Sequence, residues 1–526
     1  MTIKTQANSL VTNTNGSSSD PTSKSTISGL VLICADSPVA TSVAGMKIEG
    51  NTWRLETIEN LCRNSDAIGD AVSSEPTNRL IVALCQGEHS KSEILARSRK
   101  AGIETFGTQI VEISSADQDH SNKAAVVTAV RGTIARSEAF SSPAPENIKT
   151  AFSGSGEKIS RRALFTIPPI EYRSVPTINR SVCIAGSGCT QCEKSCPHNA
   201  MKNVAGAVKV DIGACKSCGL CVAACPQRAV EFPGYSPEEI ESQVEQVLSI
   251  NDDKATNVAF ACSKSAKLPI DDWQIIPVAC AAMVPAAALL SSVASGARSV
   301  GILRCVEECA QQSGNEVDGR IDYAKNILER AGLDSNRLVN LAPAVLEMEN
   351  PSPKVAEPKS INSPAIGFFG GTAASRSVLA ISEQSADGIE PFSHPFSPIA
   401  IPVINSSGCT MCGTCSAVCP SGALTQRNSK DQIELALDAS KCIACNECVA
   451  SCPEKANGAI ELELRTDVTA LTSGPVILNS DHSVSCKNCS TQFTSQLTLE
   501  RLEELLGEDY SQDLYGELCP ECRTLA

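Results

Sequence analysis

Aromatic residues are scarce in this sequence. They make up 3% of its 526 residues, and only two of them are tryptophan. Large aromatic-rich cores are therefore not expected, although the hydrophobic fraction of 42% is ordinary. Because a single hydrophobic core stops growing well below this chain length, the sequence is predicted to fold into several compact parts.

Long hydrophobic segments are absent as well. The longest apolar run, residues 276–290, contains two prolines and is shorter than the roughly 18 to 20 residues that span a bilayer. We expect it to form a buried strand, turn and helix. The first 26 residues are polar and lack the apolar region of a signal peptide. The prediction is a cytoplasmic protein without a membrane span, in a reducing compartment where cysteines bind metals.

Positive charge is in deficit. The formal net charge is −15, which disfavours nucleic-acid binding because that function needs a basic surface to displace counterions from phosphate. A flavin is not predicted either. No G-x-G-x-x-G fingerprint follows a strand-like segment, and Gly367, Gly370 and Gly371 have the wrong spacing.

Cysteine, by contrast, is abundant, and most of the 27 cysteines fall in C-x2-C clusters. The spacing C-x2-C-x2-C-x3-C-P is typical of bacterial two-cluster ferredoxins, in which three thiolates of one loop hold a cluster and the fourth reaches the neighbouring cluster. The complete copies are Cys215, Cys218, Cys221 and Cys225; Cys409, Cys412, Cys415 and Cys419; and Cys442, Cys445, Cys448 and Cys452. Three unbroken copies indicate iron-sulfur clusters rather than chance.

A further copy of the spacing is incomplete. Cys189, Cys192 and Cys196 are in place, but Gly186 stands where the first cysteine is expected, and Cys183 lies three residues earlier. We expect Cys183 to be the first ligand, and a degenerate or three-iron site is the alternative.

The two-cluster rule arranges these cysteines in four 4Fe-4S sites. The predicted groups are Cys183, Cys189, Cys192 and Cys225; Cys196, Cys215, Cys218 and Cys221; Cys409, Cys412, Cys415 and Cys452; and Cys419, Cys442, Cys445 and Cys448. Four zinc sites, or clusters with a purely structural role, are the alternative. The spacing disfavours zinc because it is an iron-sulfur spacing rather than a tetrahedral zinc one.

A different set of cysteines lies between the two cysteine-rich regions, each at or just beyond the end of a predicted strand, where open α/β folds assemble their sites. The set is Cys262, Cys280, Cys305 and Cys309. Here the sequence resembles the delta subunit of methyl-viologen-reducing hydrogenase, notably in the segments IPVAC at 276–280 and RCVEEC at 304–309. The resemblance implies that the four cysteines bind a 2Fe-2S cluster. Four buried free thiols are the alternative.

The first α/β region resembles the start of the heterodisulfide reductase A subunit, without that family's flavin domain. The resemblance rests on Cys34 after an apolar strand, on Cys62, and on the segment VALC that ends at Cys85. It implies a 4Fe-4S cluster held by these cysteines and an unidentified fourth group, but three packed thiols are the interpretation that we favour. His198 and His482, which lie near cysteines in the sequence, are interpreted as surface residues, and metal ligands or proton carriers are the alternative.

Two C-x2-C pairs near the C-terminus flank a helix-like stretch at 497–507. They are Cys486 and Cys489, and Cys519 and Cys522. This is the spacing of a zinc ribbon, and a single rubredoxin-like iron is the alternative.

The predicted fold class is α/β plus α+β multidomain, with two bacterial two-cluster ferredoxin-like modules, two small α/β domains and a C-terminal zinc-ribbon-like unit. The expected divisions are a disordered tail (1–27), a heterodisulfide reductase A-like α/β domain (28–140), a linker (141–180), a ferredoxin module (181–235), a hydrogenase delta subunit-like α/β domain (236–345), a linker (346–395), a ferredoxin module (396–465) and the zinc-ribbon-like unit (466–526).

A chain with this set of clusters and no flavin, nucleotide or substrate motif is equipped for one-electron relay. We predict a non-catalytic subunit that relays electrons from a low-potential donor, such as ferredoxin, to a larger complex of the hydrogenase, formate dehydrogenase or heterodisulfide reductase type. The alternative is an accessory protein for assembly or reductive activation of a molybdenum or tungsten oxidoreductase such as formate dehydrogenase.

Overall fold

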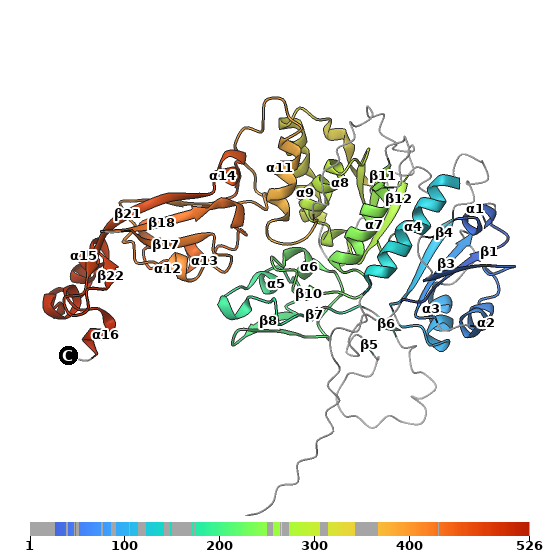
Figure 1. Cartoon of the computed structure of the whole chain (residues 1–526), viewed down its shortest axis with the longest axis horizontal. Helices are drawn as coiled ribbons and strands as arrows, with labels where there is room; N and C mark the ends of the chain where they lie inside the picture. The colour runs from blue at the N-terminus through green and yellow to red at the C-terminus, as the bar shows by residue number, and fades with distance from the viewer. Residues whose placement is uncertain are drawn as a thin grey trace, which may run out of the picture.

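The computed structural model describes residues 27–37, 40–46, 48, 52–74, 77–85, 91–104, 106–113, 123–140, 148–149, 171–172, 174–249, 256–263, 265, 273–305, 314–341, 367–429 and 431–524. These residues form a mixed α/β structure with several small sheets, drawn out along one axis (Figure 1). No helix among them is both long and apolar enough to cross a membrane. All but the last residue of the expected disordered tail, and much of the expected first linker, lie outside the described residues.

The N-terminal α/β part, within residues 27–140, is built on a parallel sheet with the strand order β2-β1-β3-β4. Strand β1 is buried on both faces: Leu32 packs into one apolar cluster and Ile33 into another. Such a continuous apolar strand is typical of a sheet with helices on both sides. The elements are β1 (Gly29–Cys34), α1 (Ala40–Ala44), β2 (Trp53–Ile58), α2 (Ala67–Ser74), β3 (Arg79–Cys85), α3 (Lys91–Lys100), β4 (Thr108–Ile113) and α4 (Lys123–Ala139).

The middle α/β part, within residues 237–341, has the same strand order, β12-β11-β13-β14, and is again parallel. The apolar run at 276–290 forms the end of β12, a 3-10 turn and the first half of α8, so the expected strand, turn and helix are confirmed. The elements are α7 (Pro237–Ser249), β11 (Asn257–Cys262), β12 (Trp273–Val278), the 3-10 turn η6 (Ala281–Met283), α8 (Ala286–Ala294), β13 (Val300–Leu303), α9 (Gly314–Arg330), the 3-10 turn η7 (Ser335–Arg337) and β14 (Leu338–Leu341).

Helix α4 of the N-terminal part packs along α7 of the middle part (Figure 1). Gly132 permits this close approach, because a Cβ atom there would lie 2.6 Å from Cγ2 of Val247. Beside it, the buried guanidinium of Arg136 donates hydrogen bonds to Oε1 of Gln243 at 2.8 Å and to the carbonyl of Gly234. A close helix pair and a buried arginine therefore fix the two parts together.

The cysteine-rich segments form two further units made of short antiparallel strands. The first cysteine-rich unit, residues 174–235, pairs β7 with β10 and β8 with β9; the second, residues 392–466, pairs β15 with β20, β16 with β19 and β17 with β18. The elements of the first unit are β7 (Thr177–Ile178), α5 (Gln191–Lys194), β8 (Met201–Val204), β9 (Ala207–Val210), α6 (Leu220–Ala224) and β10 (Val230–Glu231). Those of the second are β15 (Phe392–Ser393), β16 (Ile401–Ile404), α12 (Thr414–Ala417), β17 (Leu424–Ser429), β18 (Gln432–Asp438), α13 (Glu447–Ala450), β19 (Ile460–Glu463) and β20 (Arg465–Thr466).

Part of the segment expected as a second linker is regular structure. Helix α11 (Ala373–Ser382) lies within residues 346–395 and packs on α8, with a hydrogen bond of 2.8 Å between the hydroxyls of Ser377 and Ser291. Its apolar side chains Val378 and Ile381 are fully buried. This burial makes α11 part of the core that the middle part shares with its neighbours.

The C-terminal segment is continuous with the second cysteine-rich unit. Strand β21 pairs with β18, so that the sheet runs in the order β17-β18-β21-β22. The expected helix at 497–507 is confirmed as α15, which occupies the far end of the molecule (Figure 1). The elements are α14 (Val468–Thr472), β21 (Pro475–Ser485), β22 (Gln492–Ser495), α15 (Gln496–Leu506) and α16 (Pro520–Arg523).

Candidate metal centres

Four cavities in the two cysteine-rich units are each lined by four cysteines. The first cavity is lined by Cys183, Cys189, Cys192 and Cys225, the second by Cys196, Cys215, Cys218 and Cys221, the third by Cys409, Cys412, Cys415 and Cys452, and the fourth by Cys419, Cys442, Cys445 and Cys448. Each takes three cysteines from one sequence run and one from the other run of the same unit. The structure thus brings together the same groups that the two-cluster spacing predicts.

A left-handed residue stands directly before the second cysteine of every run. These residues are Gly188, Ser217, Met411 and Ala444, with φ of 95°, 57°, 53° and 53°. A left-handed residue within a tight turn directs successive backbone N–H groups toward the inside of the loop, an arrangement that suits an anionic group. In the incomplete run, a 3-10 turn at Ala185–Ser187 takes up the extra residues before Gly188, so Cys183 still reaches the first cavity.

The cysteine before the proline of a run accepts a backbone hydrogen bond, as three of the runs illustrate. The sulfur of Cys196 accepts from Ala200 N at 3.3 Å, that of Cys225 from Ala229 N at 3.2 Å, and that of Cys419 from Leu424 N at 3.4 Å. Such N–H donors stabilise a thiolate and tune the potential of a bound cluster.

Burial strongly disfavours free thiolates in these cavities. It raises the pKa of Cys192, Cys415 and Cys442 to about 12 and that of Cys218 and Cys448 to about 11. These sulfurs therefore become ligands only when a cation compensates the charge and displaces the proton. Four converging thiols in a desolvated pocket fit an iron-sulfur core, which supplies that positive charge.

The cysteines of the middle part gather at one edge of its sheet. Cys262 ends β11, Cys280 follows β12 and Cys305 follows β13; because these three parallel strands are neighbours, their carboxyl ends lie side by side. Cys262 and Cys280 are buried and Cys305 is half-buried. Cys309, the fourth expected ligand, lies outside the described residues.

The N-terminal part has cysteines at the corresponding edge. Cys34 ends β1, Cys62 follows β2, and Cys85 ends β3, although the side chain of Cys85 lies outside the described residues. Cys34 belongs to the apolar cluster on one face of the sheet, and Cys62 packs against the same cluster. Packed thiols remain our interpretation of Cys34 and Cys62.

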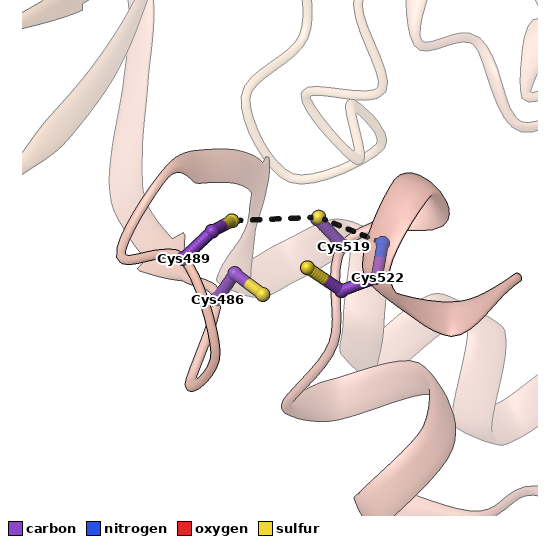
Figure 2. Close-up of side chains that lie close together, drawn as sticks. All are labelled: Cys486, Cys489, Cys519 and Cys522. Carbon is purple, nitrogen blue, oxygen red and sulfur yellow. Dashed lines mark hydrogen bonds between the residues drawn. The ribbon is translucent and has the colours of Figure 1, made fainter. Parts of the chain in front are cut away.

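The four C-terminal cysteines converge on one point (Figure 2). The Sγ atoms of Cys486, Cys489, Cys519 and Cys522 all lie within 4.8 Å of one another. The separation between the sulfurs of Cys489 and Cys519 is 3.7 Å, which matches the roughly 3.8 Å edge of a tetrahedron with metal–sulfur bonds of about 2.3 Å. The group therefore fits a single metal ion.

Backbone N–H groups donate hydrogen bonds to sulfurs of this C-terminal group. Hydrogen bonds from backbone N–H groups, chiefly that of Cys519, lower the pKa of Cys486 to about 6. The sulfur of Cys519 caps α16 and accepts from Cys522 N at 3.4 Å. These hydrogen bonds favour the thiolate form of Cys486, which is the form that binds a metal.

The two histidines differ in their surroundings. His482 is exposed on β21, as expected for a surface residue, whereas His198 is half-buried and lines the second cavity. Sequence reasoning also missed Met283, whose side chain packs over Gly219 beside that cavity. Met283 and Gly219 are distant in sequence, so no local pattern indicates their contact.

Two family models match this chain. A model of a 4Fe-4S dicluster domain matches residues 401–453, and a model of the delta subunit of methyl-viologen-reducing hydrogenase matches residues 247–356. The first segment contains all eight cysteines of the third and fourth cavities, and the second contains the cysteines of the middle part. The expected combination of a ferredoxin-type segment with a hydrogenase delta subunit-like segment is confirmed.

Curated relatives share short stretches with the chain. One is a subunit of the ion-translocating oxidoreductase complex of Methanosarcina acetivorans, which is 43% identical over 54 residues, 10% of this chain and 20% of the relative. Formate hydrogenlyase subunit 2 of Escherichia coli K12 is 44% identical over 57 residues, 10% of this chain and 28% of the relative. The chain therefore spans less than a third of the length of either relative.

Proposed function

We propose that this chain is an iron-sulfur electron-transfer protein with four 4Fe-4S clusters, one in each cysteine-lined cavity. A 2Fe-2S cluster would be held by Cys262, Cys280, Cys305 and Cys309. The observation that carries the proposal is the grouping of sixteen cysteines into four pockets, each with three ligands from one run and one from the other. Zinc ions do not need such an exchange of ligands, whereas paired cubane clusters use it.

Bound clusters would supply one-electron redox chemistry, and the protein would set their environment. Its loops bury or half-bury fifteen of the sixteen cysteines, Cys412 being exposed, and their backbone N–H groups donate to Cys196, Cys225 and Cys419. Both effects set reduction potentials. The names of the relatives, subunits of an ion-translocating oxidoreductase and of formate hydrogenlyase, support a role beside other redox proteins. We infer that the chain passes electrons from a low-potential donor to a larger hydrogenase, formate dehydrogenase or heterodisulfide reductase-type complex.

Metal analysis of anaerobically purified protein tests this proposal. We expect about 18 iron atoms per chain and paramagnetic signals after reduction with dithionite, since four cubane clusters and one binuclear cluster together contain that number. Protein that contains mainly zinc, or that shows no paramagnetic centre on reduction, would refute the assignment.

The C-terminal cysteines are proposed to bind one zinc ion in a zinc-ribbon-like unit. Cys519→Ala removes a sulfur from the tetrahedral group and the cap of α16, so we expect the loss of one zinc per chain with the iron content unchanged. Inductively coupled plasma mass spectrometry measures both metals. Cys34→Ala is the control and should leave zinc unchanged, because Cys34 is buried and belongs neither to the four cavities nor to the C-terminal group. The loss of one iron instead of one zinc would identify a rubredoxin-like site.

A second role is favoured by the position of this C-terminal group, at the end of the elongated molecule (Figure 1). A metal-bound unit there could recognise an immature molybdenum or tungsten oxidoreductase, which would make the chain an assembly or activation factor. Affinity purification during turnover separates the two roles. A stable complex with the mature enzyme supports relay, and association with the immature enzyme alone supports assembly.

A further inference from the structure

The two cysteine-rich units touch each other through charged and polar side chains. Helix α5, which carries Cys192 of the first cavity, faces the turn that leads from Cys445 of the fourth cavity into α13. The ammonium group of Lys194 lies 2.6 Å from Oε1 of Glu447, and Thr190 Oγ1 donates to the same oxygen at 2.9 Å. Glu447 is the more enclosed partner, with 16% of its side chain exposed against 52% for Lys194.

This contact reaches the ligand loop itself. The side-chain amide of Gln191 donates to the carbonyl of Cys445 at 3.4 Å, and Lys194 Nζ lies 3.5 Å from the same oxygen. The thiols of Cys189 and Cys445 are also close enough to interact electrostatically. The first and fourth cavities are therefore neighbours, although they belong to different units.

A glycine separates the walls of these two cavities. Gly371 N donates to the carbonyl of Pro226 at 2.9 Å. A Cβ atom on Gly371 would lie 2.9 Å from Cβ of Pro226 and 2.4 Å from Cγ2 of Ile443. Pro226 lines the first cavity and Ile443 the fourth. The chain thus passes between the two cavities at a position where a side chain has no room.

The second cavity has a neighbour of its own. The thiol of Cys218 interacts electrostatically with that of Cys280, and the Cβ position of Gly219 lies 2.7 Å from the sulfur of Met283. The edge of the middle sheet with its cysteines is therefore adjacent to the second cavity. Within each unit the cavities are already paired by their exchanged cysteines.

We propose that the contact of Lys194 and Gln191 with Glu447 and the Cys445 carbonyl is the electron-transfer junction between the two units. The sites then form one unbranched series: middle-part site, second, first, fourth, third. This inference rests on the proposed function and deepens it. At the junction one electron passes between the first and fourth sites, so that one is oxidised and the other reduced by one electron, with no bond formed or broken and no proton moved. Because tunnelling falls steeply with distance, the nearest pair of sites carries the transfer.

The ion pair between Lys194 and Glu447 should affect the reduction potential of the neighbouring site. A positive charge beside a site favours its reduced form and a negative charge disfavours it. Lys194 and Glu447 both adjoin the Cys445 loop, so their opposite charges have nearly cancelling effects on the potential of the fourth site. We therefore expect Lys194→Met to shift the reduction potential of the fourth site downward and Glu447→Gln to shift it upward, with little net shift in the double variant.

Redox titration followed by electron paramagnetic resonance measures these shifts in the full-length protein. Lys202→Met is the matched control: Lys202 has similar exposure and pairs with Glu193 at 3.3 Å, away from the second unit. Equal shifts of one sign in both single variants, or a shift confined to the third site, would overturn the junction. Iron content is measured in parallel. Full iron with no opposite shifts refutes the junction but leaves the proposed function standing, whereas wild-type protein without clusters refutes both.

Gly371→Ala tests the distance between the sites rather than the charge. The added methyl group must push Pro226 and Ile443 apart, so we expect weaker magnetic coupling between the reduced first and fourth sites at full iron content. Gly69→Ala is the control, because nothing lies within 4 Å of a Cβ atom there. Unchanged coupling in the Gly371 variant would contradict the series, and the charge variants decide the matter independently if this variant does not fold.

Discussion

Replacing Cys225 by alanine removes about four iron atoms, and the cluster lost is that of the first cavity. Cys225 belongs to the sequence run whose other cysteines line the second cavity, but its own sulfur lines the first. We expect the cluster to be lost because the first cavity then offers only three of the four thiolates that a cubane needs. Iron analysis and the spectra of the reduced protein report the loss.

Double variants identify which cavity was emptied. Cys183→Ala combined with Cys225→Ala should remove no more iron than Cys225→Ala alone, because both cysteines line the first cavity. Cys196→Ala combined with Cys225→Ala should remove about eight iron atoms, since it disables two sites. If each run held its own cluster, both double variants would remove about eight iron atoms. A normal iron content in Cys183→Ala would exclude that residue as a ligand.

Removing the guanidinium of Arg136 destabilises the contact between the N-terminal and middle parts by about 1 to 3 kcal/mol, as expected when buried hydrogen-bond acceptors lose their donor. Burial raises the pKa of the Glu239 carboxyl, and the positive charge of Arg136 lowers it. Arg136→Ala removes that charge, and it also removes the hydrogen bond that Arg136 donates to the carbonyl of Gly234. Native-state hydrogen exchange of α4 and α7 is the suitable measurement, because a chain with several cofactors does not unfold in one step.

Arg97→Ala provides the comparison for Arg136. Arg97 forms exposed ion pairs with Asp66 at 2.6 Å and Glu93 at 3.8 Å, and such surface pairs contribute at most about 1 kcal/mol. The same change of side chain should therefore have a small effect on exchange. Similar protection in both variants would show that the helix pair, and not the buried charge, holds the parts together.

Local patterns were sufficient to predict the cysteine groups. The C-x2-C-x2-C-x3-C-P loop places its ligands through turns of a few residues, so its spacing carries most of the geometry. The apolar strands β1 and β11 were likewise predictable, because strands buried on both faces are continuous apolar runs.

Long-range contacts were not predictable in this way. Lys194 and Glu447 are 253 residues apart, and no sequence motif indicates that they form an ion pair. Helix α11 lies in a segment whose neighbouring prolines suggested a linker, and it is ordered by burial against α8 rather than by its own sequence. The pairing of β21 with β18 depends on tertiary packing for the same reason.

The two parallel sheets share the order in which the second, first, third and fourth strands lie side by side. Both carry a cysteine at the end of their first strand, Cys34 and Cys262, and both are followed by C-x2-C motifs. The carboxyl ends of the two sheets are therefore equivalent places in the two folds. Cys34 stands in the N-terminal part where Cys262 stands in the middle part, at the edge where open α/β folds assemble their sites.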